Sequence, residues 1–169
     1  DMYRNINNIN RNLVFIIIFF GILSRILPLP PNFSPVIAIT LFGSLYFKDK
    51  NLAFIAPISI ILLSDLILGF IPNFNTYLPL IFVYFFSRKI NRISILNLFI
   101  ASLIFFLTSN FGVWLLSNWY PKSFAGLLMC YEAALPFFRN TLLSTLIFGL
   151  LFKVSFERTS NFITGKINS

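Results

Sequence analysis

The chain has 169 residues, of which 57% are hydrophobic and only 11% are charged. A soluble domain carries about 25% charged residues, and 23 phenylalanines exceed what one small water-soluble core can hide. The composition therefore excludes an ordinary soluble domain and predicts an integral membrane protein whose main partner is the lipid bilayer. The net charge of +8 does not indicate nucleic acid, because the basic residues lie between apolar runs, where they act as topology signals.

Continuous apolar runs, separated by prolines or charges, predict an all-α polytopic bundle of six transmembrane helices in a single domain over residues 1–169. In chain order the predicted spans are 13–27, 35–47, 52–70, 77–87, 93–116 and 138–152, with an extra outer helix over 123–134 before the sixth. Alternating segments, which a β-barrel would need, are lacking.

The second and fourth predicted spans are short. Thirteen residues rise roughly 20 Å, against a hydrocarbon thickness of about 30 Å. We therefore expect these spans to recruit flanking residues, to thin the bilayer, or to be shielded by neighbouring helices.

The basic residues predict the orientation. Ten of the thirteen fall before the first span, in every second connection, or after the last span. They are Arg4, Arg11, Lys48, Lys50, Arg88, Lys89, Arg92, Lys153, Arg158 and Lys166. Because Lys and Arg mark the cytoplasmic face, we expect a multi-pass protein of the inner (plasma) membrane with cytoplasmic tails at 1–12 and 153–169. Arg25, Lys122 and Arg139 are the exceptions.

In this orientation, a set of ionisable and amide side chains lies towards the outer side of the predicted bundle. The set consists of Arg25, Asn32, Asp65, Asn110, Glu132, Arg139 and Asn140. An ionised group inside a membrane costs about 2.5–3.5 kcal/mol, so such groups normally face partners or a wet cavity. Two hypotheses follow. Either the two arginines and two carboxylates only brace the bundle, or the set lines an outward-facing pocket that binds a small solute.

Aromatic residues and a proline-rich connection lie at the same level. Trp114, Trp119, Tyr120 and Tyr131 suit the aromatic belt at a membrane surface; alternatively, they stack on a ring-containing ligand. The connection over 28–35 holds four of the nine prolines and is therefore stiff. It is either a tight turn, in which Asn32 and other polar residues cap the second span, or a lid over the outward cavity.

The sequence offers little for catalysis, metals or cofactors. The chain has one cysteine, so it cannot form an intramolecular disulfide or a cysteine-cluster metal site. It has no histidine, which removes His-based zinc sites and Ser-His-Asp or Cys-His catalysis. No glycine-rich phosphate loop is present. We therefore predict no catalytic residues, no metal site and no cofactor; an intramembrane enzyme using Asp65 or Glu132 is the weakest alternative.

Four segments resemble a known family. They are Pro-Pro-Asn-Phe-Ser-Pro-Val at 30–36, Leu-Leu-Ser-Asp-Leu at 62–66, Thr-Ser-Asn-Phe-Gly-Val-Trp at 108–114, and the run at 130–143 that contains Phe-Phe-Arg-Asn-Thr. Together they resemble a bacterial family of small integral membrane proteins of unassigned function that are grouped with transport proteins. That family is similar to the six-helix substrate-binding (S) components of energy-coupling-factor vitamin transporters.

The resemblance covers roughly residues 20–150 and implies an outward-facing pocket for a vitamin or other micronutrient, released by toppling of the bundle in the membrane. Span one lacks the Ala-x-x-x-Ala pattern by which typical S components dock; Gly21 and Ser24 are its only small residues. This departure counts against coupling to an energy-coupling transmembrane or ATPase module, and a solitary transporter is the open alternative. The alternative to transport is a non-transporting structural or interaction subunit.

Overall fold

The computed structural model describes residues 11–167, with side chains described up to residue 159. The described residues form six helices and no strand. The helices are α2 (Arg11–Ile26), α3 (Val36–Tyr46), α4 (Lys50–Leu68), α5 (Phe74–Ser87), α6 (Ile95–Leu116) and α7 (Phe124–Ile167). The predicted all-α class is confirmed. Most of the predicted N-terminal tail, with Arg4, and the side chain of Lys166 lie outside the described residues.

Three helices are long and apolar enough to cross a membrane: α4, α6 and the part of α7 over Phe124–Thr159. Helices α3 and α5 are apolar but shorter. The membrane character predicted from the composition is thus supported by three helices, and the lengths of the others have to be understood from their packing.

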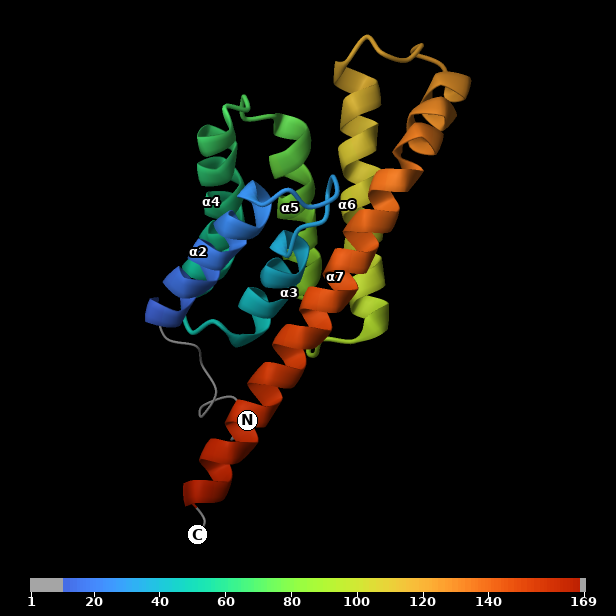
Figure 1. Ribbon diagram of the computed structural model, residues 1–169. Helices are drawn as coiled ribbons and strands as arrows, with labels where there is room; N and C mark the ends of the chain where they lie inside the picture. The colour runs from blue at the N-terminus through green and yellow to red at the C-terminus, as the bar shows by residue number, and fades with distance from the viewer. Residues whose placement is uncertain (1–10, 168–169) are drawn as a thin grey trace.

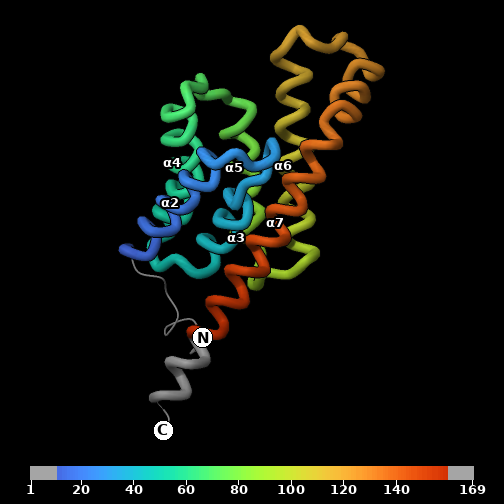
Figure 2. Tube along the Cα trace, in the orientation of Figure 1, coloured from blue at the N-terminus to red at the C-terminus, as the bar shows by residue number. Residues whose placement is uncertain are grey.

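Consecutive helices alternate in direction (Figure 1), so that α2, α4 and α6 point towards one end of the molecule and α3, α5 and α7 towards the other. The connections after α3 and α5 share one end, which carries Lys48, Arg88, Lys89 and Arg92 and is called the basic end here. The connections after α2, α4 and α6 lie on the opposite side, and the one between α6 and α7 extends furthest from the basic end. Helices α6 and α7 form a hairpin that packs beside the other four (Figure 2).

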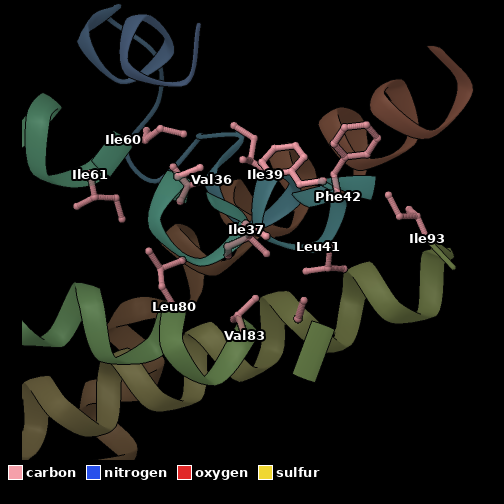
Figure 3. Packing of buried hydrophobic residues seen from close by; sticks show 14 of the residues in the cluster. Val36, Ile37, Ile39, Leu41, Phe42, Ile60, Ile61, Leu80, Val83 and Ile93 are labelled. Carbon is pink, nitrogen blue, oxygen red and sulfur yellow. The ribbon is translucent and has the colours of Figure 1, made fainter. Parts of the chain in front are cut away.

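The short helix α3 is the centre of the molecule. It contacts α4, α5, α6 and α7, and nine of its eleven residues, from Val36 to Ser44, are buried. Figure 3 shows its Ile37 and Leu41 among side chains of neighbouring helices such as Leu80 of α5. Eleven residues rise only about 16 Å, but a helix enclosed by others has no face that must match the bilayer. Of the three expectations for the short second span, shielding by neighbours is the one observed.

A close approach of α2 to α4 fixes the relative position of these helices. Gly21 of α2 is buried, and a Cβ at this position would lie 2.5 Å from Cδ1 of Ile60 on α4. A larger residue at this position would require the Ile60 side chain or the helix to shift. Residues four positions further along each helix lie on the same face, so the contact also brings Arg25 next to Ser64.

One predicted boundary is wrong. The outer helix over 123–134 and the sixth span over 138–152 are a single 44-residue helix, α7, which continues through Pro136 and into the predicted C-terminal tail. A proline removes one backbone donor, but α7 is held to α6 on both sides of Pro136. Before it, the Tyr131 hydroxyl donates to the Leu107 carbonyl at 2.8 Å; after it, the Phe138 ring lies 4.6 Å from that of Phe106.

Candidate functional site

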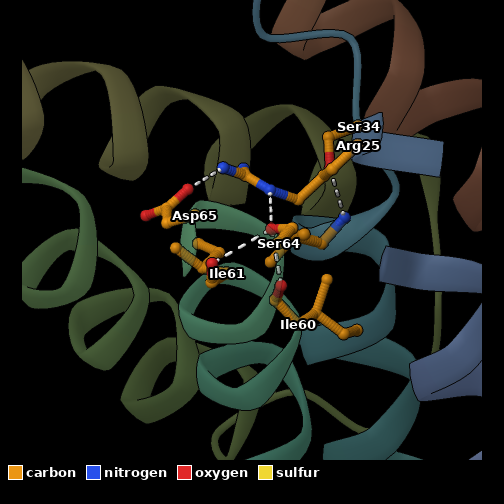
Figure 4. Close-up of polar contacts among 7 residues, drawn as sticks. Arg25, Ser34, Ile60, Ile61, Ser64 and Asp65 are labelled. Atoms are coloured by element: carbon orange, nitrogen blue, oxygen red, sulfur yellow. Dashed lines mark hydrogen bonds and ion pairs between the residues drawn. The ribbon is translucent and has the colours of Figure 1, made fainter. Parts of the chain in front are cut away.

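An ion pair joins α2 to α4 at the end opposite the basic end. The Arg25 guanidinium donates to Oδ1 of Asp65 at 2.6 Å and to Oγ of Ser64 at 2.5 Å (Figure 4). Ser64 in turn donates to the Ile60 carbonyl at 2.7 Å, which orients its oxygen for Arg25. The Asp65 side chain is 8% exposed and that of Arg25 is 21% exposed. The two opposite charges therefore compensate each other in a largely dry site.

A cavity of about 250 Å³ lies beside this pair and is lined by residues of all six described helices and of the connections after α2 and α4. Its polar lining consists of Arg25, four asparagines (Asn32, Asn73, Asn75 and Asn110) and four hydroxyl side chains (Ser34, Thr76, Ser109 and Thr141). Its apolar lining includes Phe105, Phe106, Phe137 and Phe138. Asp65 does not line the cavity, so its carboxylate acts on a solute only through Arg25. The lining is thus rich in neutral groups that can both donate and accept hydrogen bonds.

The proline-rich connection forms one wall of the cavity. Asn32 has a φ of 63°, and the Phe33 amide donates to the Pro30 carbonyl at 2.9 Å. This is the pattern of a turn with proline at its second position and a left-handed asparagine at its third. The wall is attached to α7, because Nδ2 of Asn140 donates to the Pro31 carbonyl at 3.0 Å.

The expected capping of α3 by Asn32 is wrong. The N-cap of α3 is Pro35, which has no side-chain cap bond. Asn32 belongs to the preceding turn, and Ser34 accepts only a long hydrogen bond, of 3.4 Å, from the Val36 amide. Asn32 therefore does not cap α3, and it is one of the residues that line the cavity.

Two of the lining asparagines keep an oxygen that accepts no hydrogen bond from the described chain. Asn110 donates through Nδ2 to the Phe106 carbonyl of its own helix at 2.8 Å, which leaves its oxygen for a solute. Oδ1 of Asn75 is buried without a partner among the described residues, and it lies against Gly112, where a Cβ would collide with it. Gly112 thus lets α5 bring Asn75 close to α6.

Several residues predicted from the sequence are not at the cavity. Trp114 donates through Nε1 to the Pro121 carbonyl at 2.9 Å, with Nζ of Lys122 5.8 Å from its ring centre, so it fixes the α6–α7 connection. Tyr120 lies in that connection, and Tyr131 bonds to α6 as described above. None of these three aromatic side chains lines the cavity.

The predicted cluster of four charges does not form. Glu132 and Arg139 are exposed on α7, and within the described chain no ion pair links them to Arg25 or Asp65. The reason is the helix face. Phe138 packs against α6, and each residue of a helix turns by about 100°, so its neighbour Arg139 points away from the bundle.

Sequence reasoning missed much of the cavity, notably Asn73, Asn75, Thr76 and Ser109. The first three lie at the start of α5, before the predicted fourth span begins. A signal was present in α6, where Phe106, Ser109, Asn110 and Val113 recur at helical spacing and share one face.

Comparison with known proteins gives one match. Residues 5–163 match a family of unknown function, DUF6580. The chain belongs to this family. No curated protein and no solved structure matches it. The matched residues include the Arg25–Asp65 pair and all residues that line the cavity described above, but the DUF6580 family has no assigned activity. Membership in a family of unassigned function is thus established, and the similarity to S components remains a proposal.

Proposed function

We propose that this DUF6580 protein crosses the bacterial inner membrane with six helices and binds a small, uncharged polar solute in the cavity for transport. The cavity beside the compensated Arg25–Asp65 pair carries this proposal. Its lining includes the end of α2, the connection to α3 and the start of α5, which lie opposite the basic end, and by the positive-inside rule that side would face outwards. Both termini would then be cytoplasmic.

The size and lining of the cavity indicate the class of solute. About 250 Å³ is slightly below the usual range of roughly 300–1,000 Å³ for ligand pockets, which favours a small molecule. Arg25 is the only charged residue in the lining, and Asp65 compensates it. A charged solute would have to compete with this pair or remain unpaired, whereas amides and hydroxyls bind uncharged polar groups well. The phenylalanines supply an apolar wall for its flat or carbon-rich face.

The arrangement of the helices supports transport of the bound solute. Alternating apolar helices that bury a short central helix, with a polar cavity beside it, match what the resemblance to S components implies. The solute would be a vitamin or similar micronutrient, and movement of the bundle would release it inwards. A solitary transporter fits the chain better than docking through α2, whose small residues include Gly21, a residue already used in packing on α4.

Uptake by purified protein in liposomes tests the proposal. The solutes to assay are uncharged polar compounds that raise the unfolding temperature of the protein. We expect Ser109→Phe, which fills the cavity, to abolish uptake. Trp119→Ala, at an exposed position that does not line the cavity, serves as the matched control and should retain it. Equal uptake by both variants would refute transport through this site.

The second candidate is a structural or interaction subunit that does not transport. It is favoured by one observation: the Arg25–Asp65–Ser64 contact joins α2 to α4, and Asp65 itself does not line the cavity. Under this alternative, two variants should alter the stability of the protein: the double variant Arg25→Met/Asp65→Leu and the single variant Ser109→Phe. No solute should change the unfolding temperature of the wild type.

A further inference from the structure

Helix α7 carries a stripe of leucines interrupted by two charges. The stripe consists of Leu128, Glu132, Leu135, Arg139, Leu143 and Leu150, whose spacings of three, four and seven place them on one helix face. All six side chains are exposed; that of Leu135 is 54% exposed. The opposite face, with Ala134 and Phe138, packs into the molecule.

The two charges lie beside the middle of α6 rather than beside its end. Tyr131, next to Glu132, bonds to Leu107, and Phe138, next to Arg139, packs on Phe106. Because α6 runs from Ile95 to Leu116, these contacts fall at its centre. Helix α6 is long and apolar enough to cross a membrane; with α6 spanning the bilayer, as the proposed function requires, Glu132 and Arg139 lie at the depth of the hydrocarbon core.

Ionised side chains at this depth need a neutralising partner. Each costs about 2.5–3.5 kcal/mol when exposed to lipid. Glu132 and Arg139 lie two turns apart on the stripe and do not pair with each other in the described chain. The neighbouring leucines provide an apolar surface for helix packing, but they have no group that can neutralise a charge. A binding partner on this face of α7 must therefore carry charged groups that pair with Glu132 and Arg139.

A second copy of the chain does not supply these charges. Two copies with the same membrane orientation are related by an axis along the membrane normal, which keeps equivalent residues at equal depth. Glu132 would face Glu132 and Arg139 would face Arg139, and contacts between like charges are unfavourable. The basic end opposes the inverted orientation that would pair them.

We propose that the α7 stripe is the docking surface for a transmembrane helix of a different membrane protein. That helix carries a basic group facing Glu132 and an acidic group, about two turns away, facing Arg139. The docking site lies on the outer face of α7, does not use the cavity, and does not depend on solute binding. Binding of the partner helix therefore depends on both the sign and the spacing of its charges, since a helix with the two charges exchanged would place like charges together.

Photo-cross-linking of the full chain in its native membrane tests this. A photoreactive amino acid replaces Leu135 on the stripe or, as the matched control, Phe19 on the exposed face of α2. We expect one adduct with a different membrane protein from Leu135 and none of that mass from Phe19. Mass spectrometry of the cross-linked peptide should find a membrane helix with an acidic residue.

Charge exchange decides whether the adduct is the proposed complex. Arg139→Glu should lower its yield at least tenfold, and exchanging the partner's acidic residue for arginine should restore it. Arg158→Glu, an exposed reversal near the end of α7, should leave the yield unchanged. Unaltered unfolding temperatures of Glu132→Gln and Arg139→Gln exclude misfolding as the cause. Adducts only with lipid, an adduct of two identical chains, or a yield that ignores the charge at Arg139 would each overturn the proposal.

Discussion

Two pairs of charged residues in this protein lie in opposite environments. Arg25 and Asp65 face each other between α2 and α4, and both are largely buried. Glu132 and Arg139 lie beside the middle of α6, on the exposed face of α7. The first pair is compensated within the chain, and the second requires compensation from outside. The comparison teaches that the face of the helix on which a charged side chain lies decides whether it meets a partner inside the chain.

Breaking the buried pair should have the largest effect. Asp65→Leu leaves the Arg25 charge without its partner, and we expect the free energy of unfolding to fall by about 3–5 kcal/mol. Unfolding of the purified protein in mixed detergent micelles measures this. The matched change on the exposed face, Glu132→Leu, should cost far less. The double variant Arg25→Met/Asp65→Leu should recover most of the loss, because no unpaired charge remains. Equal losses of unfolding free energy for Asp65→Leu and Glu132→Leu would contradict the predicted difference between the buried pair and the exposed pair.

Disturbing the packing that positions the buried pair should have a smaller effect. Gly21→Leu forces α2 away from Ile60, and overpacking of this kind costs about 1–3 kcal/mol. The same shift moves Arg25 away from Asp65. Ala133→Leu adds a similar volume on the exposed face of α7 and should leave stability unchanged. The same unfolding assay distinguishes the two variants. A Gly21→Leu protein as stable as the wild type would show that the close packing of α2 on α4 does not position Arg25 against Asp65.

Removing one hydrogen-bonding group from the cavity should weaken binding without unfolding the protein. Asn110→Ala deletes an amide oxygen that lines the cavity, and we expect a loss of about 0.5–1.5 kcal/mol in solute affinity. Calorimetric titration with the bound solute measures it. Asn97→Ala is the control, because Asn97 lies on the same helix but does not line the cavity. An equal loss of affinity in both variants would place the solute elsewhere.

Neutralising the exposed charges should have the smallest effect on the isolated protein. Neither Glu132 nor Arg139 has a hydrogen-bond or ion-pair partner in the described chain, so the double variant Glu132→Gln/Arg139→Gln should change the free energy of unfolding by less than about 0.5 kcal/mol. A thermal unfolding scan is sufficient. A loss comparable with that of Asp65→Leu would mean that these charges brace the bundle after all.

Much of the fold could be predicted, because prolines and charges end the apolar runs. The predicted second span, 35–47, differs from α3 by one residue at each end, and the predicted fifth span ends with α6 at Leu116. The break before the predicted sixth span failed for a physical reason. Pro136 is tolerated because packing on α6 holds both halves of α7 in line, and no local signal reveals that packing.

The candidate site was predictable only in part. Depth identified Arg25, Asn32 and Asn110 at the cavity, and Asp65 beside it. Asn73 and Asn75 were missed because α5 begins at Phe74, earlier than the hydropathy of the segment indicates. Glu132 and Arg139 were expected to lie with Arg25 and Asp65 but are exposed on α7, since the direction of a side chain around a helix depends on which neighbour the helix packs against.

The most direct test of solute binding is the unfolding temperature of the purified protein, measured beside that of Ser109→Phe with matched uncharged and charged polar solutes. At a hundredfold excess over the dissociation constant, a bound solute stabilises the folded state by about 2.7 kcal/mol. The account predicts that an uncharged polar solute raises the unfolding temperature of the wild type and leaves that of Ser109→Phe unchanged. Equal shifts in the two proteins, or shifts only with charged solutes, would contradict it.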